Sequence, residues 1–259
     1  MRSKEPARRC GVLASRLCAG ALALALSGGC ASRNAAESAP PSEAPQDVVA
    51  PPEGATGYEA KPGWPVRSMA VAAAHPLAAG AGYRILAAGG NALDAAIAVQ
   101  MVLALVEPQS SGLGGGALLL LWDGRALSAW DGRETAPAAA DERLFLGADG
   151  KPMSMAQAIV GGRAVGVPGA VRMLEAAHRV HGRLPWARLF EPAIELAQGG
   201  FAVGARLHAL LAADARLPLD PIARRYFYDA NGAAWPVGHR LKNPALAEIL
   251  RAIAARGAD

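Results

Sequence analysis

The sequence is poor in cysteine and in aromatic residues. Its three cysteines, Cys10, Cys18 and Cys30, all precede residue 31, so the body of the chain can form neither a disulfide framework nor a thiolate metal site. Aromatic residues make up only 5% of the chain, whereas apolar residues make up 52%. Small residues therefore supply much of the apolar content, and we expect closely packed helices and tight turns rather than aromatic clusters.

Net charge is missing from most of the chain. The formal charge of +4 comes from residues 1–29, where five basic side chains accompany one acidic side chain, and the charges balance beyond residue 29. A neutral chain has no overall field that would attract phosphate backbones, so we expect no nucleic-acid partner.

The basic N-terminus leads into an apolar run over residues 17–26, which is too short to span a bilayer comfortably. A basic start followed by such a run is typical of a secretory signal peptide. The run is followed by small residues and Cys30, as in a bacterial lipobox, although Ser27 stands where leucine is usual. We therefore predict a signal peptide over 1–29, lipidation of Cys30 and a periplasmic or cell-envelope lipoprotein. Ordinary cleavage nearby is the alternative.

Composition divides the rest of the chain into two parts. Residues 30–64 hold the predicted lipid-anchor cysteine and are rich in alanine, proline, serine and glutamate without apolar periodicity, which is typical of a flexible or polyproline-like linker. Residues 65–259 show the periodic apolar patterns of a folded domain.

The folded region is predicted to contain helices and one hairpin. We expect a buried strand over 69–74, a helix over 77–88 and, after Asn91 and a capping box with Asp94, a buried helix that ends before Pro108. Asp123-Gly124 between apolar runs at 117–122 and 126–130 predicts a hairpin turn. Further helices are expected over 168–180, 185–197, 205–215 and 244–256. The predicted fold class is α+β, with strands backed by helical layers.

Two stretches beside the hairpin carry candidate site residues. Residues 108–116 are dense in glycine but lack the Gly-Lys-Ser/Thr of a phosphate loop and precede a strand, so tight backbone packing or a turn beside a site is the better interpretation. After the hairpin, Arg133 and Glu134 precede Ala136-Pro137. They could form a surface ion pair; alternatively, the planar guanidinium of Arg133 could bind a substrate carboxylate through two parallel hydrogen bonds.

No metal or cofactor is expected. His178 and His181 lie three residues apart at a helix end, but the neighbouring sequence supplies no further ligand, and basic groups at a helix C-terminus explain them better. Glu191 and Glu195 lie four residues apart on a helix, where a solvated position is a simpler explanation than a catalytic one. The Gly-x-Ser-x-Gly motif of a serine nucleophile does not occur.

Several of these motifs together resemble the γ-glutamyltransferase (glutathione hydrolase) family. The matching segments are, in chain order, GNALDAA at 90–96, PQSSGLGGG at 108–116, DGRETAP at 131–137, VGVPG at 165–169, and residues 184–201 from Leu-Pro-Trp to Gly-Phe. The resemblance spans residues 66–259, and the order of several separated motifs makes it specific.

The resemblance implies a fold and a mechanism. The fold would be the four-layer αββα sandwich of N-terminal-nucleophile hydrolases, incomplete in this chain. A precursor of this family cleaves itself, and the new N-terminal threonine of the small subunit attacks the γ-amide of glutathione or another γ-glutamyl compound. The γ-glutamyl group then passes to water or to an amino-acid or peptide acceptor. The resemblance places the substrate α-carboxylate on Arg133 and makes Glu134 a second substrate-binding residue.

The resemblance also implies that this chain corresponds to the N-terminal portion of the large subunit. Its two threonines are Thr56 in the linker and Thr135 beside Glu134, and neither follows a cleavage site. We therefore expect no catalytic residue in this chain, with the nucleophile and the oxyanion-binding glycines in the small subunit of the same precursor. Two alternatives stay open: a β-lactam acylase or poly-γ-glutamate-processing relative of the same fold, and a non-catalytic lipoprotein that binds a partner.

Overall fold

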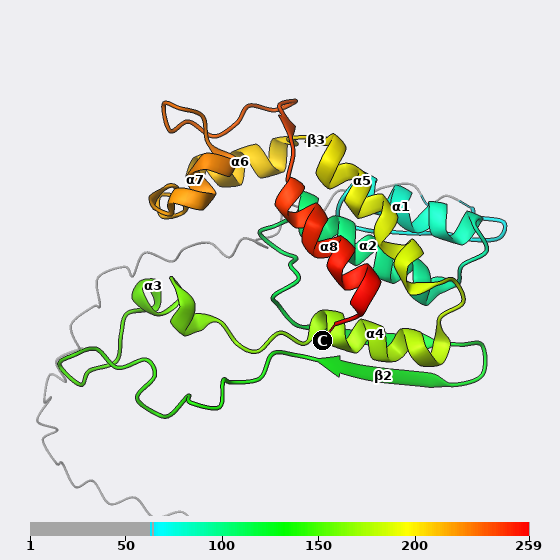
Figure 1. Cartoon of the computed structure of the whole chain (residues 1–259), viewed down its shortest axis with the longest axis horizontal. Helices are drawn as coiled ribbons and strands as arrows, with labels where there is room; N and C mark the ends of the chain where they lie inside the picture. The colour runs from blue at the N-terminus through cyan, green and yellow to red at the C-terminus, as the bar shows by residue number, and fades with distance from the viewer. Residues whose placement is uncertain (1–62, 64, 259) are drawn as a thin grey trace, which may run out of the picture. The chain divides into compact units, whose positions relative to one another are not determined.

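Helices dominate the described part of the chain, and its strands occur as two short antiparallel pairs (Figure 1). The computed structural model describes residue 63 and residues 65–258. The α-helices are α1 (Pro76–Ala87), α2 (Ala92–Val106), α3 (Met155–Ala158), α4 (Ala170–His181), α5 (Glu191–Gly199), α6 (Ala205–Ala213), α7 (Pro221–Phe227) and α8 (Pro244–Arg256). The 3-10 helices are η1 (Gly162–Ala164), η2 (Trp186–Phe190) and η3 (Leu217–Leu219), and the strands are β1 (Ala117–Trp122), β2 (Leu127–Gly132), β3 (Phe201–Ala202) and β4 (Arg240–Leu241). The predicted α+β class is confirmed.

The first two helices begin and end where the sequence indicates. His75 caps α1, because its Nδ1 atom accepts a hydrogen bond from the N–H of Leu77 at 3.2 Å. The residues after α1 include Gly89, whose φ of 92° favours glycine. Asn91 and Asp94 form the predicted capping box at the start of α2. The predictions for both helices are confirmed.

Helix α2 lies at the centre of the core and contacts α1, α4, α5 and η2. It is apolar around most of its circumference, and Ile97, Met101 and Val102 are fully buried. Helix α1 approaches it closely because position 82 is glycine: a Cβ atom there would lie 2.7 Å from Val99 Cγ2. The structure therefore confirms the predicted buried helix and the close packing of helices with small residues.

The predicted hairpin is also confirmed. Strands β1 and β2 pair antiparallel, with Leu118 opposite Asp131 and Trp122 opposite Leu127. The turn between them holds Gly124 at a φ of 95°. Asp123 Oδ1 accepts hydrogen bonds from the N–H groups of Arg125 and Ala126. Burial alternates along both strands, so the hairpin has one packed face and one exposed face.

The packed face of the hairpin lies on α4, as Figure 1 shows. The approach is close, since a Cβ atom on Gly132 would lie 2.5 Å from Met173 Cβ. The opposite face is apolar and open. We call it the hairpin outer face, and its large side chains, each at least 61% exposed, are Leu118, Leu120, Trp122 and Leu127.

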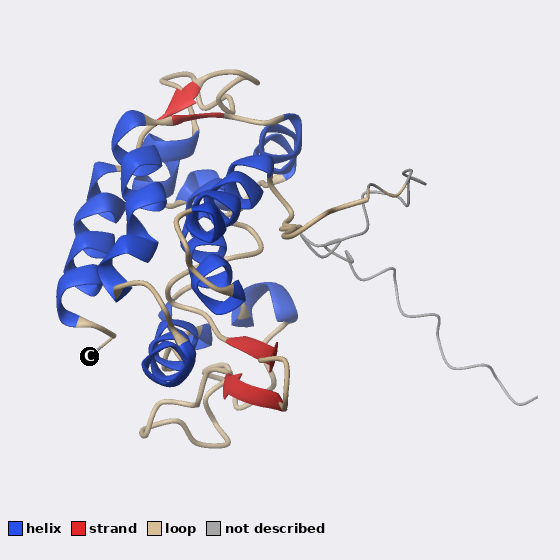
Figure 2. Cartoon of the chain, turned by 90° about the vertical axis from the view of Figure 1, so that its right-hand side faces the viewer, coloured by secondary structure: helices blue, strands red, loops and turns tan. Residues whose placement is uncertain are grey.

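The C-terminal half adds a second group of helices around α2. Helix α8 packs against α5 and η2, and α5 also contacts α2. Figure 2 shows β3 and β4 as a separate strand pair at the end of this half. The carboxylate of Glu175 on α4 accepts a hydrogen bond from the N–H of Ala258 at 3.0 Å. This bond holds the residues after α8 against α4.

Some predicted features differ from the structure or lie outside it. The predicted buried strand at 69–74 is wrong: these residues alternate between half-buried and exposed, as extended chain does, but no described strand takes up their backbone hydrogen bonds. Helix α4 begins after Pro168 rather than at it. Helices α3 and α7 and the β3–β4 pair were not predicted. The predicted signal peptide, Cys30 and the predicted linker up to residue 62 lie outside the described residues, so these features stay predictions. None of the helices that the structure describes is long and apolar enough to cross a membrane.

Candidate functional site

Arg133 and Glu134 follow β2 directly and lie in a segment that is held from both sides. The N–H of Arg133 donates a hydrogen bond to Asp131 Oδ1 at 2.9 Å. Two residues further on, Thr135 and Val167 exchange backbone hydrogen bonds of 3.3 and 2.8 Å. The backbone that carries the two candidate side chains is therefore fixed before and after them.

Three glycines allow other backbone segments to approach the Arg133–Glu134 segment. A Cβ atom on Gly116 would lie 2.8 Å from Arg133 Cα, one on Gly166 would lie 2.8 Å from Glu134 Cβ, and one on Gly169 would lie 2.8 Å from the carbonyl oxygen of Arg133. Within the stretch 108–116, tight backbone packing is confirmed at Gly116, whereas Gly114 has open space around it.

The glycine-dense stretch also contacts the beginning of α4. The carbonyl oxygen of Gly115 accepts hydrogen bonds from the N–H groups of Gly169 and Ala170, at 3.2 and 3.1 Å. The motifs at 108–116, 131–137 and 165–169 thus meet at one place, although they are far apart in the sequence. Their meeting point is the end of the hairpin where Arg133 lies.

The charges of Arg133 and Glu134 form a loose pair. Arg133 Nη1 lies 3.6 Å from Glu134 Oε2, and the two side chains are 66% and 30% exposed. This distance exceeds that of a hydrogen bond, so the pair leaves the donors of the guanidinium available. Glu134 Oε2 is buried and has no hydrogen-bond partner among the described residues. A buried acceptor without a donor is energetically costly.

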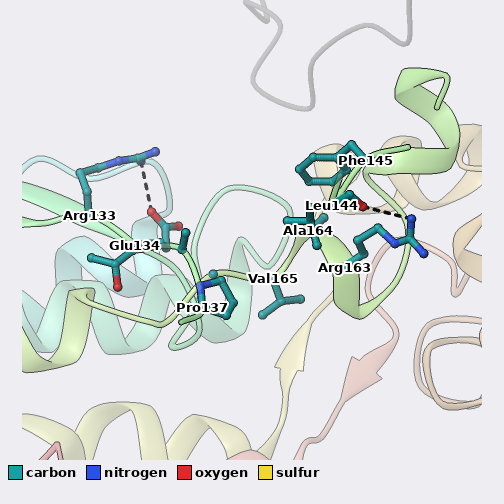
Figure 3. A pocket seen from close by; sticks show the side chains of 11 residues that line it. Arg133, Glu134, Pro137, Leu144, Phe145, Arg163, Ala164 and Val165 are labelled. Carbon is teal, nitrogen blue, oxygen red and sulfur yellow. Dashed lines mark hydrogen bonds and ion pairs between the residues drawn. The ribbon is translucent and has the colours of Figure 1, made fainter. Parts of the chain in front are cut away.

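A cavity of about 370 Å³ lies beside this pair (Figure 3). One side of its lining is the segment from Arg133 to Pro137, and the other comes from Leu144, Phe145 and the residues from Arg163 to Gly166. The volume falls at the lower end of the range for small-molecule pockets. Arg163 was missed by the sequence reasoning, because only the folding of the loop between residues 137 and 163 brings it to the cavity that Arg133 also lines.

The cavity contains one hydroxyl residue, Thr135, but its position does not suit a nucleophile. Its backbone N–H donates a hydrogen bond to Val167 within the chain, whereas an N-terminal nucleophile needs a free α-amine as its base. Thr135 is an internal residue of this chain, and that it is not the nucleophile stays a prediction.

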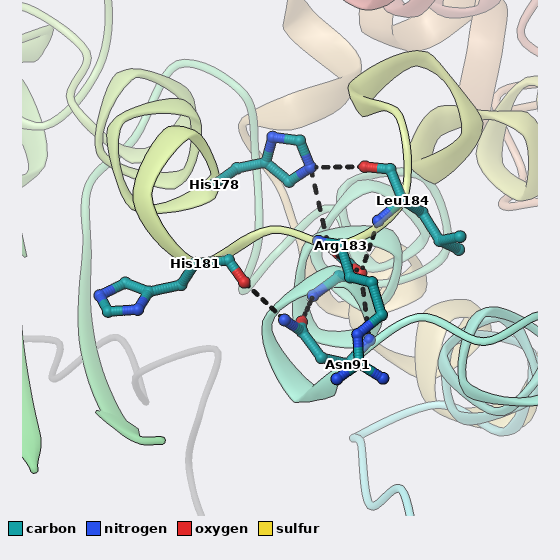
Figure 4. A network of polar contacts seen from close by, with 6 residues as sticks. Asn91, His178, His181, Arg183 and Leu184 are labelled. Atoms are coloured by element: carbon teal, nitrogen blue, oxygen red, sulfur yellow. Dashed lines mark hydrogen bonds and ion pairs between the residues drawn. The ribbon is translucent and has the colours of Figure 1, made fainter. Parts of the chain in front are cut away.

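The two histidines at the end of α4 belong to a structural network (Figure 4). Asp94 is fully buried, and its carboxylate accepts hydrogen bonds from the N–H groups of Asn91, Arg183 and Leu184 at 3.0–3.2 Å. His178 Nε2 lies 2.9 Å from the carbonyl oxygen of Leu184, and the carbonyl of His181 accepts from Asn91. The network ties the start of α2 to the loop after α4, and His178 takes part through its ring whereas His181 takes part through its backbone carbonyl.

The paired glutamates on α5 are solvated, as predicted. Glu195 forms an ion pair with Arg84 in which both side chains are 58% exposed, and Glu191 pairs with Arg188 at 3.4 Å. Within residues 65–258 no three His, Cys, Asp or Glu side chains come together in a way that could hold a metal ion. The Arg133–Glu134 segment and its cavity are therefore the best candidate site in this part of the chain.

Comparisons with known proteins agree with the motifs that meet at this site. Residues 78–259 match the model of one family, described as gamma-glutamyltranspeptidase. The glutathione hydrolase proenzyme of Bacillus subtilis (strain 168) is 37% identical over 191 residues, which cover 73% of this chain and 32% of the relative. The crystal structure of Helicobacter pylori gamma-glutamyltranspeptidase matches with a TM-score of 0.71 at 31% identity, over 76% of this chain and 56% of that one.

A cephalosporin acylase from Bacillus halodurans has a similar structure as well. Its TM-score is 0.63 at 31% identity, and the match covers 78% of this chain and 40% of the acylase. These likenesses show the predicted N-terminal-nucleophile hydrolase fold, of which the described residues form a part. The chain spans about a third of the length of the Bacillus subtilis relative.

Proposed function

Because the chain belongs to the gamma-glutamyltranspeptidase family, we propose that it supplies the donor-binding part of an enzyme that cleaves γ-glutamyl amides such as glutathione. The γ-glutamyl group would pass to water or to an amino-acid or peptide acceptor. The observation that carries this proposal is the exposed guanidinium of Arg133 at a cavity, beside a carboxylate that lacks a hydrogen-bond donor.

The charges of the site match the amino-acid end of a γ-glutamyl donor. That end carries a carboxylate and an ammonium group on the same carbon. The planar guanidinium of Arg133 would bind the carboxylate through two parallel hydrogen bonds, and the partly exposed carboxylate of Glu134 would accept a hydrogen bond from the ammonium. With this end fixed, the γ-amide is held at a defined distance from the site, where a nucleophile can attack it.

The nucleophile would come from the small subunit of the same precursor, as its N-terminal threonine. The hairpin outer face supports a partner of this kind, since its four large apolar side chains are open to solvent next to the Arg133 segment. Leu120 lies in the middle of this face. Leu120→Lys should therefore reduce association of the two polypeptides in a pull-down, whereas Leu219→Lys, on a similarly exposed leucine in η3, should leave association unchanged.

A cephalosporin acylase of the same fold is the alternative function. A glutaryl group has a carboxylate but no ammonium, so it would use Arg133 and leave Glu134 without a donor. The unpartnered Oε2 atom of Glu134 therefore favours a γ-glutamyl donor. We expect Glu134→Gln to lower the kcat/KM for glutathione more than that for glutaryl-7-aminocephalosporanic acid. Faster turnover of the glutaryl compound by the wild-type enzyme would favour the acylase.

The main test of the proposal is Arg133→Lys in the enzyme assembled with its small subunit. A lysine ammonium keeps the charge but cannot form two parallel hydrogen bonds, so the KM for glutathione should rise by roughly tenfold or more. The control is Arg125→Lys at the hairpin turn, which lies outside the cavity lining and should leave the KM unchanged. Unchanged kinetics in Arg133→Lys would refute the proposed role, and a wild-type assembly that cleaves no γ-glutamyl amide would favour a binding protein.

We also propose that the protein is exported and lipidated on Cys30. Support comes from the basic N-terminus, the apolar run over 17–26 and the small residues before Cys30. Metabolic labelling with an alkyne fatty acid in the native bacterium should mark the wild-type protein and not Cys30→Ala. Label that persists in the variant would contradict the proposal, and absence of label from both would favour ordinary signal cleavage.

A further inference from the structure

The candidate cavity contains a second arginine, Arg163, at the end away from Arg133 (Figure 3). Arg163 belongs to η1, immediately before the segment that pairs with Thr135. Leu144 and Phe145 line the cavity between the two arginines. The cavity therefore has a cationic group near each end and an apolar stretch between them.

The guanidinium of Arg163 is fixed by the backbone of the neighbouring loop. Its Nη1 atom donates hydrogen bonds to the carbonyl oxygens of Leu144 and Leu146, at 3.1 and 3.4 Å, and lies 3.2 Å from Met153 Sδ. All three of these interactions use the same nitrogen atom. The other donors, on Nη2 and Nε, make no hydrogen bond to the residues that the structure describes.

The positive charge of Arg163 is not neutralised locally. No carboxylate of the described residues lies within 4.0 Å of its guanidinium, whereas the nearby exposed Arg143 pairs with Asp141 at 2.9 Å. Among the ionisable residues that line the cavity, Arg133 and Arg163 are cationic and Glu134 is anionic. The cavity thus carries one net positive charge, and a ligand with one net negative charge would complement it.

We propose that Arg163 binds a second carboxylate, the one on the leaving group of the donor, and so selects γ-glutamyl peptides that end in a free carboxylate. The inference rests on the proposed function. Such a donor has two carboxylates and one ammonium group, so it carries one net negative charge, which complements the net positive charge of the cavity. Arg133 and Glu134 bind its amino-acid end, Leu144 and Phe145 contact its middle, and the free donors of Arg163 bind its far carboxylate. Donors with a neutral leaving group make no use of Arg163.

The test compares two donors that differ only in the far carboxylate: glutathione and its glycine ethyl ester. Both are assayed with the enzyme assembled with its small subunit. The variants are Arg163→Gln, which removes the charge, Arg163→Lys, which keeps it, and the matched control Arg143→Gln, whose side chain pairs with Asp141 and does not line the cavity.

We expect the wild-type enzyme to prefer glutathione over the ester by roughly tenfold in kcat/KM. Arg163→Gln should abolish this preference by raising the KM for glutathione, with the kcat/KM for the ester unchanged. Arg163→Lys should retain part of the preference, and Arg143→Gln should retain all of it. An effect on glutathione alone separates binding of the far carboxylate from a general role in loop structure, because a displaced loop would affect both donors.

Three results would overturn the inference. The first is equal loss of activity toward both donors in Arg163→Gln, and the second is unchanged kcat/KM for glutathione in that variant. The third is a wild-type enzyme that cleaves both donors equally well. A wild-type enzyme that cleaves neither donor would instead overturn the proposed function, and the inference with it.

Discussion

Replacing Gly116 with alanine would disturb the Arg133–Glu134 pair without removing either side chain. A Cβ atom at this position would lie 2.4 Å from Glu134 Oε2 and 2.8 Å from Arg133 Cα. The carboxylate could rotate away from the new methyl group, but the Cα atom of Arg133 can move only with its backbone. That backbone is held by Asp131 before it and by the pairing of Thr135 after it.

The size of the expected effect follows from these distances. Ordinary van der Waals contact begins near 3.4 Å, so the Arg133 backbone would have to move by about 0.6 Å and the Glu134 carboxylate by about 1 Å. A misplacement of about 1 Å in a positioning group can cost about 100-fold in rate. We expect Gly116→Ala to lower the kcat/KM for glutathione by roughly 10- to 100-fold, mainly through the KM.

The matched control is Gly114→Ala in the same loop. A Cβ atom on Gly114 would meet no atom within 4 Å, and neither Gly114 nor Gly116 has a positive φ. Kinetics with glutathione would be measured for both variants in the enzyme assembled with its small subunit, together with urea unfolding to identify any general loss of structure. Equal kcat/KM in the two variants would refute the idea that close backbone approach positions Arg133 and Glu134.

Two further predictions concern stability and pH. Asp94→Ala removes the buried acceptor of the N–H groups of Arg183 and Leu184 and should lower the free energy of unfolding by about 3 kcal/mol. Glu195→Ala breaks only an exposed ion pair and should lower it by less than about 1 kcal/mol. Equal losses of the two variants in urea unfolding would contradict this expectation. Burial raises the pKa of Tyr226 from 10.0 to about 12, so its neutral form stabilises the fold fully below pH 10, and this contribution is lost as the pH rises from 10 toward 12. Between about pH 9 and 11.5 the wild-type protein should therefore lose more unfolding free energy than Tyr226→Phe, and parallel pH curves for the two proteins would show that this phenol does not govern the loss.

Local signals made much of the fold predictable. The capping box of Asn91 and Asp94, the turn at Asp123-Gly124 and the glycine after α8 act within a few residues, so the sequence shows them directly. These features need no knowledge of what lies across the core. Arg133 differs from them: its position after a strand left open whether it forms a surface ion pair or binds a carboxylate, and the family resemblance assigned it to the substrate.

The features that sequence reasoning missed depend on distant contacts. Arg163 reaches the cavity only because the loop from 137 to 163 folds back, and its guanidinium is oriented by the carbonyl oxygens of Leu144 and Leu146. The β3–β4 pair joins Phe201 to Leu241 across 40 residues, with only two residues in each strand. Strands this short carry no detectable alternation of apolar and polar residues.

The wrong prediction at 69–74 and the hairpin outer face have a common physical explanation. The run from Ala117 to Trp122 is apolar at every position, which is typical of a strand buried on both faces, yet the structure buries only the face on α4. Residues 69–74 likewise have the burial pattern of a strand without a neighbour to pair with. The proposed small subunit would supply what both segments lack, an apolar layer over Leu120 and a strand beside Val71. If so, amide hydrogen exchange at residues 69–74 should be fast in this chain alone and at least tenfold slower in the assembled enzyme, since strand pairing protects N–H groups from exchange. Equally fast exchange in the assembly would show that the apolar pattern of these segments has another cause.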